Sequence, residues 1–247
     1  MKNQQRIAAL TAYDFPTAKM LDDAGIPLIL VGDSVGMVIL GYPDTTHVTM
    51  DEMEHHTRAV ARAKPRGLLV SDLPIASYRT PQEAVENACR LARAGAEAVK
   101  AEGGREILPQ VQAIIAAGIP FLGHLGMLPQ SVLKEGGYHV KGKAEAERNA
   151  LIEDAQALSK AGAFAIVLEL VVPAVAREIT QKIEIPTIGI GAGSGCDGEV
   201  LVITDLLGTS GEYVPKHVKK CWHFGSQMKN AVLEWKQDVI QSKKFLS

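Results

Sequence analysis

Six ionisable side chains lie at or just after short apolar runs of the sequence, and they are the residues best suited to chemistry. They are Asp33, Asp72, Lys100, Glu102, His124 and Glu169. When parallel strands close into a barrel, the segments that follow the strands meet around one mouth. If the apolar runs are strands of such a barrel, these side chains face one pocket.

The acidic residues among them predict a metal site. Asp33, Asp72 and Glu102 would supply oxygen ligands from three separate strands, with no cysteine, and such a set suits Mg²⁺ better than zinc. Mg²⁺ usually keeps several water ligands, which leaves positions for a keto acid that chelates through two oxygens. The metal would stabilise the enolate that forms when a proton leaves the carbon next to the keto group.

The other three side chains have predicted roles around that substrate. Lys100 would supply positive charge for the substrate carboxylate, and a structural salt bridge with one of the acids is a compatible alternative. Glu169 follows an apolar run, so partial desolvation would raise its pKa toward the range of a general base; a metal-bridging or structural role is the alternative. His124 could polarise an oxygen or hold a ligand through a hydrogen bond, or it could be structural.

Simpler explanations exist for single members of this set. Asp33 or Asp72 alone could cap the following helix or be solvated. Recurrence on five consecutive strands favours a shared pocket, because independent caps need not converge on one mouth. The glycine-rich run at residues 189–195 resembles a phosphate-binding loop, but glycines that only permit tight turns and close packing are the favoured interpretation.

The elements that position these residues follow from the hydrophobic pattern. Short apolar, often β-branched runs alternate with segments of helical period, which is typical of repeated βα units. The runs are residues 6–12, 28–32, 67–71, 98–101, 120–123, 165–168, 187–190 and 200–204. Eight βα units within 247 residues is the usual size of a (β/α)₈ barrel, also called a TIM barrel. We predict a single α/β barrel domain over residues 1–247, with an open doubly wound sheet as the alternative.

Local signals mark the ends of several helices. Thr49 with Glu52 and Thr80 with Glu83 match the capping box, and Pro81 suits the first position of a helix. Four glycines are expected to end helices in the left-handed conformation: Gly25, Gly95, Gly118 and Gly162.

The last segment of the chain predicts an amphipathic helix. Over residues 219–244, Trp222, Met228, Val232, Trp235 and Val239 recur at roughly helical spacing among lysines and glutamines. Packing against the barrel and docking on a neighbouring subunit are equally compatible with this pattern.

Composition excludes several classes of partner. A formal net charge of −2 provides no strong field for nucleic acid or an anionic membrane. No segment approaches the roughly 18 unbroken apolar residues of a membrane span, and the N-terminus lacks a secretory signal, so we expect a soluble, cytoplasmic protein. The cysteines, Cys89, Cys196 and Cys221, lie far apart and are expected to be free thiols.

Longer motifs add a family resemblance. Residues 10–14, 31–37, 56–60, 99–104, 123–131, 136–138, 162–169 and 185–193 closely resemble, in the same order, the ketopantoate hydroxymethyltransferases. The match runs from about residue 6 to about residue 220. It implies a barrel of the phosphoenolpyruvate mutase and isocitrate lyase type. It also implies transfer of a one-carbon unit from 5,10-methylenetetrahydrofolate to 3-methyl-2-oxobutanoate, which gives 2-dehydropantoate and tetrahydrofolate in pantothenate and coenzyme A biosynthesis.

The resemblance also assigns roles to residues. By residue-by-residue carry-over, Asp33, Asp72 and Glu102 would hold one Mg²⁺ per subunit. Asp33, Ser34, Asp72 and Lys100 would bind the keto acid, with His124 as a further candidate contact, and Glu169 would accept the proton. Family members assemble into large rings, often decamers, so a homo-oligomer is expected, and the terminal helix could contribute to it.

Some positions depart from the family pattern, and rival functions remain. The departures follow Asp72 and Glu169 at residues 73–75 and 170–173, and they include Ser194-Gly195; none removes an expected ligand. One rival is a lyase or mutase of the same superfamily, whose nucleophilic cysteine has its nearest counterpart in Lys219-Lys220-Cys221. The other is a barrel scaffold without activity, which would have no need to keep like charges close together.

Overall fold

The structure, a computed structural model, describes residues 2, 5–210, 215–218 and 222–242, together with the side chains of all of these except residue 242. It divides into two compact units, residues 1–201 and 202–247. Each unit is described by itself. That the two units form one domain, as the sequence predicts, stays a prediction.

The first unit is a closed parallel barrel, which confirms the predicted fold. In its described residues the barrel has eight strands, in the order β1-β2-β3-β4-β5-β6-β7-β8, and β8 pairs with β1. The strands are β1 (Ile7–Thr11), β2 (Leu28–Val31), β3 (Leu68–Asp72), β4 (Ala98–Glu102), β5 (Phe121–Gly126), β6 (Ala165–Glu169), β7 (Thr187–Ile190) and β8 (Gly198–Leu201).

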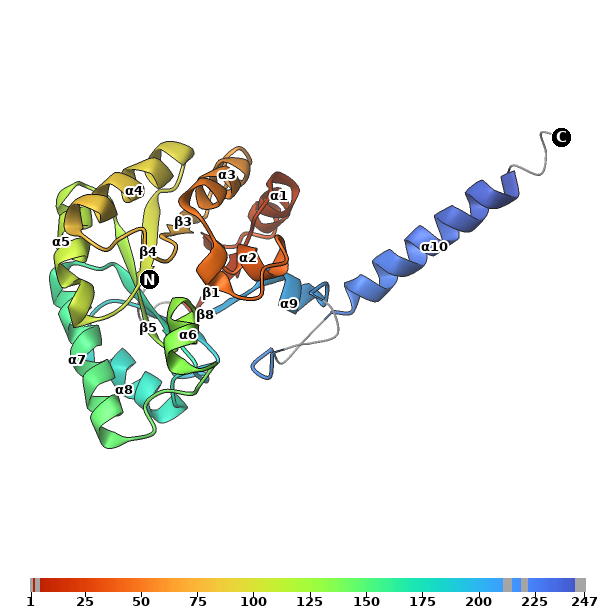
Figure 1. The fold of residues 1–247 in the computed structure, drawn as a ribbon. Helices are drawn as coiled ribbons and strands as arrows, with labels where there is room; N and C mark the ends of the chain where they lie inside the picture. The colour runs from red at the N-terminus through yellow and green to blue at the C-terminus, as the bar shows by residue number, and fades with distance from the viewer. Residues whose placement is uncertain (1, 3–4, 211–214, 219–221, 243–247) are drawn as a thin grey trace. The chain divides into compact units, whose positions relative to one another are not determined.

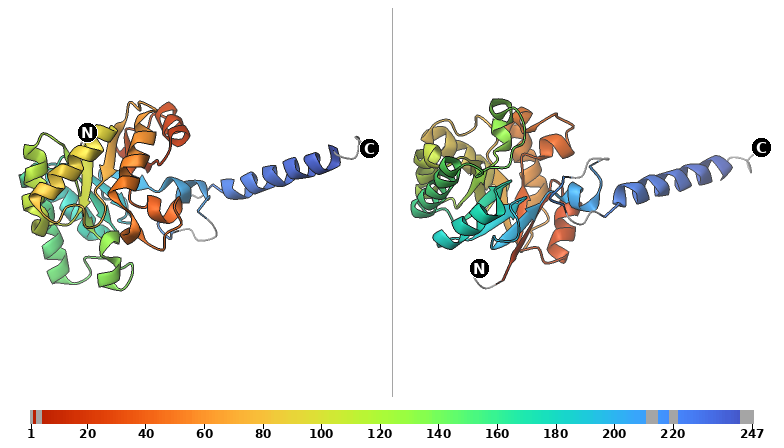
Figure 2. Two further views of the ribbon diagram at one scale, coloured as in Figure 1. Left: turned by 45° about the horizontal axis from the view of Figure 1, so that its top comes forward. Right: turned by 90° about the horizontal axis from the view of Figure 1, so that it is seen from below.

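Helices connect the successive strands from β1 to β7 and cover the outside of the barrel (Figures 1 and 2), whereas β8 follows β7 without a helix between them. They are α1 (Phe15–Asp23), α2 (Val35–Val38), α3 (Met50–Ala61), α4 (Pro81–Ala94), α5 (Leu108–Ala116), α6 (Val132–Glu135), α7 (Glu145–Ala161) and α8 (Pro173–Lys182). Short 3₁₀ turns precede three of them: η1 (Thr45–His47), η2 (Arg105–Ile107) and η3 (Pro129–Ser131).

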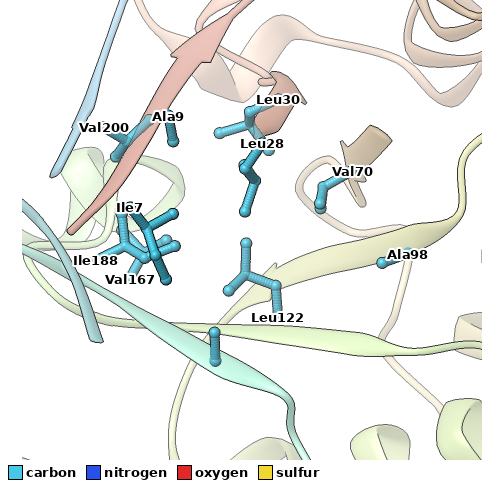
Figure 3. Packing of buried hydrophobic residues seen from close by; sticks show 11 residues of the cluster. Ile7, Ala9, Leu28, Leu30, Val70, Ala98, Leu122, Val167, Ile188 and Val200 are labelled. Atoms are coloured by element: carbon cyan, nitrogen blue, oxygen red, sulfur yellow. The ribbon is translucent and has the colours of Figure 1, made fainter. Parts of the chain in front are cut away.

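The barrel interior is an apolar core built from alternate strand residues (Figure 3). Its members are Ile7, Ala9, Leu28, Leu30, Val70, Ala98, Leu122, Ala165, Val167, Ile188 and Val200. Because successive strand side chains point to opposite faces, every second residue of each strand enters this core. Most residues between them are covered by the surrounding helices, as the continuous apolar runs predict, whereas Ala8 on β1 and Glu199 on β8 are exposed.

Most of the predicted local signals are confirmed, and two need correction. Gly25, Gly95, Gly118 and Gly162 all have positive φ angles, and the Thr49 capping box is complete. At Thr80 the hydroxyl accepts from the Glu83 backbone N–H, but no reciprocal bond forms, because the Glu83 carboxylate pairs with Arg79 instead.

The second correction concerns the last strand, which begins two residues earlier than predicted and ends at Leu201. Gly198 pairs with Ile7 so closely that a Cβ there would lie 2.5 Å from the Ile7 carbonyl oxygen. A glycine therefore starts the strand where the apolar pattern gives no signal, and Ile203 already belongs to a helix.

The second unit contains α9 (Ile203–Leu207) and α10 (Phe224–Ser242). Helix α10 confirms the predicted terminal helix, although Trp222 precedes it and residues 219–221 and 243–244 lie outside the described residues. Cys89 and Cys196 are free thiols, as predicted, whereas Cys221 falls outside the described part of the chain. Within that part, no helix combines the length and the apolar character needed to cross a membrane.

Candidate active site

The ionisable side chains predicted from the sequence form a buried layer at the C-terminal end of the barrel core. Strand β4 shows why, since Ala98 belongs to the core and Lys100 and Glu102 follow it at intervals of two residues. The same spacing carries Val70 to Asp72 on β3 and Val167 to Glu169 on β6. These side chains therefore point into the barrel interior, above its apolar part.

Lys100 lies at the centre of this layer. Its Nζ is 3.0 Å from Asp72 Oδ2 and 3.1 Å from His124 Nδ1. Register explains both contacts, because Lys100 pairs with Asp72 on β3 and Glu102 pairs with His124 on β5. Burial alone would lower the pKa of Lys100, but the negative charges of Asp72, Asp33 and Glu102 outweigh it and raise the pKa, so the ammonium stays charged.

His124 is neutral and has a defined tautomer. Burial and the neighbouring Lys100 charge lower its pKa well below the usual value. An ammonium has no acceptor, so Nδ1 of His124 must accept the hydrogen bond from Lys100, and the ring proton is on Nε2. This atom is buried 3.2 Å from Glu169 Oε2, although the two are not aligned as a hydrogen bond. The imidazole thus connects the Lys100 charge to the predicted base.

Two buried carboxylates each have one oxygen held and one oxygen without a hydrogen bond. Asp72 Oδ2 accepts from the Asp33 backbone N–H at 3.1 Å and Glu102 Oε2 from the Gln130 backbone N–H at 3.0 Å. Asp72 Oδ1 and Glu102 Oε1 are buried and have no hydrogen-bond partner. Burial and the nearby Asp33 charge raise the pKa of Asp72 and of Glu102, and Lys100 opposes both shifts.

The residue set fits a divalent cation. Asp33, Asp72 and Glu102 bring three carboxylates against the single ammonium of Lys100, and two of their oxygens are left unpaired in a buried place. A hard divalent cation would coordinate such oxygens, and its positive charge would offset the repulsion between the carboxylates. In the described residues, however, no three His, Cys, Asp or Glu side chains are already gathered as a metal cluster. The carboxylates instead hold Lys100 and N–H donors.

Ser34 lies beside this group, at the start of α2. Its hydroxyl is 2.8 Å from the Tyr13 hydroxyl, and Gly32 leaves the room it needs, because a Cβ on Gly32 would lie 2.8 Å from Ser34 Oγ. The same Cβ would lie 3.6 Å from Asp72 Oδ2. The structure therefore brings Ser34 close to the predicted ligands Asp33 and Asp72.

The backbone around Glu169 is fixed by an unusual conformation. Leu170 has a φ of 46°, a value uncommon for a residue with a side chain. Its N–H donates to the Ile190 carbonyl and its carbonyl accepts from the Lys141 N–H, while the Glu169 carbonyl accepts from the Met127 N–H. These three hydrogen bonds hold the turn after β6 in this conformation. The backbone therefore fixes the direction in which the Glu169 side chain leaves the strand.

Three residues near the site were missed by the interpretation of the sequence. Gln130 donates from Nε2 to Asp33 Oδ2 at 2.8 Å, and the hydroxyl of Tyr78 donates to Gln130 Oε1 at 2.7 Å. Burial, together with the charges of Glu169, Asp33 and others, raises the pKa of Tyr138 to about 12. Two signals were available for Gln130 and Tyr138: both follow β5 at the barrel mouth, and both lie within the motifs at residues 123–131 and 136–138 that carry the family resemblance.

The glycine-rich run after β7 packs closely against α8. A Cβ on Gly193 would lie 2.8 Å from Pro173 Cβ, and one on Gly195 would lie 2.8 Å from Arg177 Cβ. Close packing is therefore a sufficient reason for these glycines, in agreement with the favoured interpretation of the sequence.

Comparison with known proteins identifies the family. The family model described as ketopantoate hydroxymethyltransferase matches residues 1–245. This chain belongs to the ketopantoate hydroxymethyltransferase family. Its curated relatives include 3-methyl-2-oxobutanoate hydroxymethyltransferases from Ignicoccus hospitalis, 52% identical over 96% of this chain and 90% of that protein, and from Dehalococcoides mccartyi strain CBDB1, 51% identical over 97% and 87%. The resemblance inferred from the sequence is thus confirmed.

Solved structures similar to this ketopantoate hydroxymethyltransferase family member share its fold at low identity. A phosphonomutase of Burkholderia cenocepacia J2315 gives a TM-score of 0.66 at 16% identity, covering 94% of each chain. Phosphonopyruvate hydrolase in complex with oxalate and Mg²⁺ gives 0.61 at 15%, covering 96% of this chain and 83% of that one. A 2,3-dimethylmalate lyase, described as a PEP mutase/isocitrate lyase superfamily member, gives 0.56 at 16% with coverages of 97% and 83%. These likenesses agree with the predicted (β/α)₈ barrel fold.

Proposed function

We propose that this protein transfers a one-carbon unit from 5,10-methylenetetrahydrofolate to C3 of 3-methyl-2-oxobutanoate, giving 2-dehydropantoate and tetrahydrofolate. The observation that carries the proposal is the layer at the barrel mouth in which buried Asp72, Lys100, Glu102 and His124 lie beside the partly buried Glu169. Relatives about half identical over nearly the whole chain bear the name of this activity.

A divalent cation, Mg²⁺ in our proposal, with one ion per subunit, would be held by Asp33, Asp72 and Glu102. When bound, the ion would supply Lewis-acid stabilisation of the negative charge that develops on the substrate's keto oxygen. Two observations support the choice: the unpaired oxygens of Asp72 and Glu102, and the Mg²⁺ named with oxalate in phosphonopyruvate hydrolase, which shares the fold.

The protein's own residues would bind the keto acid and move one proton. Lys100 stays protonated and faces the substrate carboxylate, while Ser34 and the ligands Asp33 and Asp72 complete the binding site. A carboxylate oxygen of Glu169 removes the proton from C3. The Nε2–H of neutral His124 lies next to that carboxylate and can orient it without giving it a full positive charge. The carbanionic C3 then forms a bond to the methylene carbon of the folate in its iminium form. Water breaks the bond between that carbon and the folate nitrogen and supplies the hydroxyl group of 2-dehydropantoate, and tetrahydrofolate leaves with the nitrogen protonated.

Proton exchange at C3 tests this function one step at a time. In heavy water with Mg²⁺ and without folate, NMR should show loss of the C3 proton signal of 3-methyl-2-oxobutanoate with the parent protein. Glu169→Gln keeps the shape but removes the base, so we expect the exchange rate to fall by about 10²- to 10⁴-fold. Glu199→Gln is the matched control, because Glu199 also belongs to a strand but is exposed.

Each result has a defined meaning. Exchange that requires metal and disappears only in Glu169→Gln supports both the enolate step and the base. Parent-level exchange in Glu169→Gln would remove Glu169 from the proposed role. No exchange and no folate-dependent turnover in the parent would reject the activity and favour a barrel that binds without catalysis.

The remaining features of the family belong to the same proposal. We infer that the enzyme works in the cytoplasm, in the pathway to pantothenate and coenzyme A, and as a homo-oligomer, decameric as the family resemblance implies. The composition of the chain, with a formal net charge of −2, supports partners that are small molecules rather than nucleic acid.

A further inference from the structure

Gln130 uses its side chain and its backbone to connect the ends of separate strands. The residue is buried in the turn η3, which follows β5. Its Nε2 donates to Asp33 Oδ2 at 2.8 Å and to the Leu73 carbonyl at 3.0 Å, and its backbone N–H donates to Glu102 Oε2 at 3.0 Å. One residue from the fifth βα segment therefore holds acidic side chains that follow β2 and end β4.

Tyr78 fixes the orientation of the Gln130 amide. Its hydroxyl lies 2.7 Å from Gln130 Oε1 and 3.3 Å from the Glu102 carbonyl oxygen. With Oε1 accepting from the phenol, both amide hydrogens are directed to Asp33 and to the Leu73 carbonyl. The reversed amide would place Oε1 against a carboxylate and a carbonyl, two groups that can only accept here. The hydrogen-bonding capacity of the Gln130 side chain is thus matched to these three partners.

This arrangement determines which carboxylate oxygens have no hydrogen-bond partner and are available to a cation. The Gln130 N–H occupies Oε2 of Glu102, and Oε1 has no hydrogen-bond partner. On β3, the Asp33 N–H and Lys100 hold Oδ2 of Asp72, and Oδ1 has no hydrogen-bond partner either. Gln130 also restrains the Asp33 carboxylate through Oδ2. The contacts of Gln130 therefore act on two of the three proposed ligands at once.

We propose that Gln130, oriented by Tyr78, is a positioning residue that presents Asp33 and Glu102 to the divalent cation. The inference rests on the proposed function, because it assumes that these carboxylates bind a cation. Without the side-chain amide, Asp33 would lose a donor and could turn toward Lys100, and the turn that carries the backbone N–H to Glu102 would lose its side-chain anchors, so the cation would have to reorganise these ligands when it binds. Partners of this kind around metal ligands typically change metal affinity by roughly 10- to 100-fold.

Metal binding without substrate tests the inference. Mn²⁺ serves as the probe, and the EPR signal of free Mn²⁺ is titrated with full-length protein in the absence of keto acid and folate. Gln130→Met keeps the length of the side chain and removes its side-chain hydrogen bonds, among them the one to Asp33, while the backbone bond to Glu102 stays, so we expect an affinity lower by about 10- to 100-fold. Tyr78→Phe removes only the orienting hydroxyl and should weaken binding several-fold, in the same direction.

The matched control is Gln110→Met. Gln110 also donates a side-chain hydrogen bond to a backbone carbonyl, that of Arg79, but it lies on α5 outside the ionisable layer. This variant should bind Mn²⁺ like the parent. C3 proton exchange adds a second readout: raising the metal concentration should restore most of the rate in Gln130→Met, because the defect is in metal affinity. A purely structural role would instead lower the melting temperature and leave the affinity of the folded protein unchanged.

The outcomes separate this inference from the proposed function. Parent-like Mn²⁺ affinity in folded Gln130→Met, or in Tyr78→Phe if the first variant does not fold, overturns the inference and leaves the proposed function in place. A parent protein that binds no Mn²⁺ overturns the proposed metal site and the inference with it. Weakened binding in both variants, with Gln110→Met unchanged, supports the inference.

Discussion

Charged side chains at the two ends of the barrel differ in how completely their hydrogen-bonding groups are satisfied. At the N-terminal end of the strands, Lys2 donates to the carbonyl oxygens of Thr180, Ile183 and Ile185 at 2.7 to 2.9 Å. Beside it, Asp197 accepts from the backbone N–H of Thr187 at 2.9 Å. Every charge named here has complementary partners, and these contacts join the chain near β1 to the segments around β7.

At the C-terminal end, three carboxylates share the single ammonium of Lys100, and oxygens of Asp72 and Glu102 are unpaired. Buried polar atoms without hydrogen bonds lower the stability of the folded protein. Stability alone therefore does not explain the arrangement of charges at this end. The comparison indicates that the N-terminal end stabilises the barrel, whereas the C-terminal end keeps its charges for a ligand. The same fold therefore separates stability and activity along its axis.

The largest effect should come from a neutral substitution at the C-terminal end. Asp72→Asn removes one proposed ligand. Loss of a residue that only hydrogen-bonds to a metal ligand typically costs roughly 10- to 100-fold in metal affinity, so we expect the metal-dependent exchange rate to fall by at least about 100-fold. Stability should not fall with it, since burial, together with repulsion by Asp33, disfavours the Asp72 charge more than the neighbouring Lys100 favours it. Exchange NMR and urea unfolding of the metal-free protein measure the two quantities.

A loss of stability in Asp72→Asn as large as its loss of activity would contradict the comparison. Gain of stability together with loss of exchange would be its strongest support, because the parent would then keep an unfavourable charge for its function. Asp23→Asn, on the exposed surface of α1, is the control for the effect of removing a carboxylate as such.

The same substitution at the N-terminal end should have the opposite profile. In Asp197→Asn the amide oxygen can still accept from Thr187, but the bonds are no longer charge-assisted, and Lys2, 3.5 Å away, loses its ion-pair partner. We expect a loss of about 1 kcal/mol in the free energy of unfolding and unchanged exchange activity at saturating metal. Urea unfolding and exchange NMR again provide the measurements, and reduced activity with intact stability would refute the assignment of this end.

The fold could be predicted from the sequence because its signals are local. Short apolar runs gave each of the eight strands in the described residues, and the glycines after α4 and α7 marked where those helices end. The start of β8 could not be predicted, because Gly198 carries no apolar signal and its place depends on close contact with Ile7, almost the whole chain away.

The site could be predicted only as far as spacing along single strands allows. Residue type and position placed Lys100 and the acidic residues Asp72, Glu102 and Glu169 at one mouth, and counting every second residue from the core residue Ala98 explains why Lys100 points inward. The role of Gln130 depends on partners after three other strands and on the rotamer of one side chain. No pattern within a single segment contains that information.

The smallest expected effect is on the pH dependence of stability in the metal-free protein, and it has opposite signs at the two ends. Burial raises the pKa of Asp72 from 3.8 to about 7, so between these values the folded protein holds a proton that the unfolded chain has lost. Stability from this group therefore falls as the pH rises through that window. Beside β3 at the N-terminal end, the Arg66 backbone N–H lowers the pKa of Asp22, so Asp22 stabilises the fold above 3.8 and this contribution is lost only as the pH falls further.

Melting temperatures measured with a chelator from pH 4 to pH 8 distinguish the two cases. Asp72→Asn should gain stability relative to the parent as the pH rises, by a few degrees in total, since one titrating group contributes only part of the stability. Asp22→Asn should show a deficit that stays constant over the same window. If the two variants had parallel pH profiles, the charges at the two ends would be equally well satisfied, and the separation of stability from activity along the barrel axis would fail.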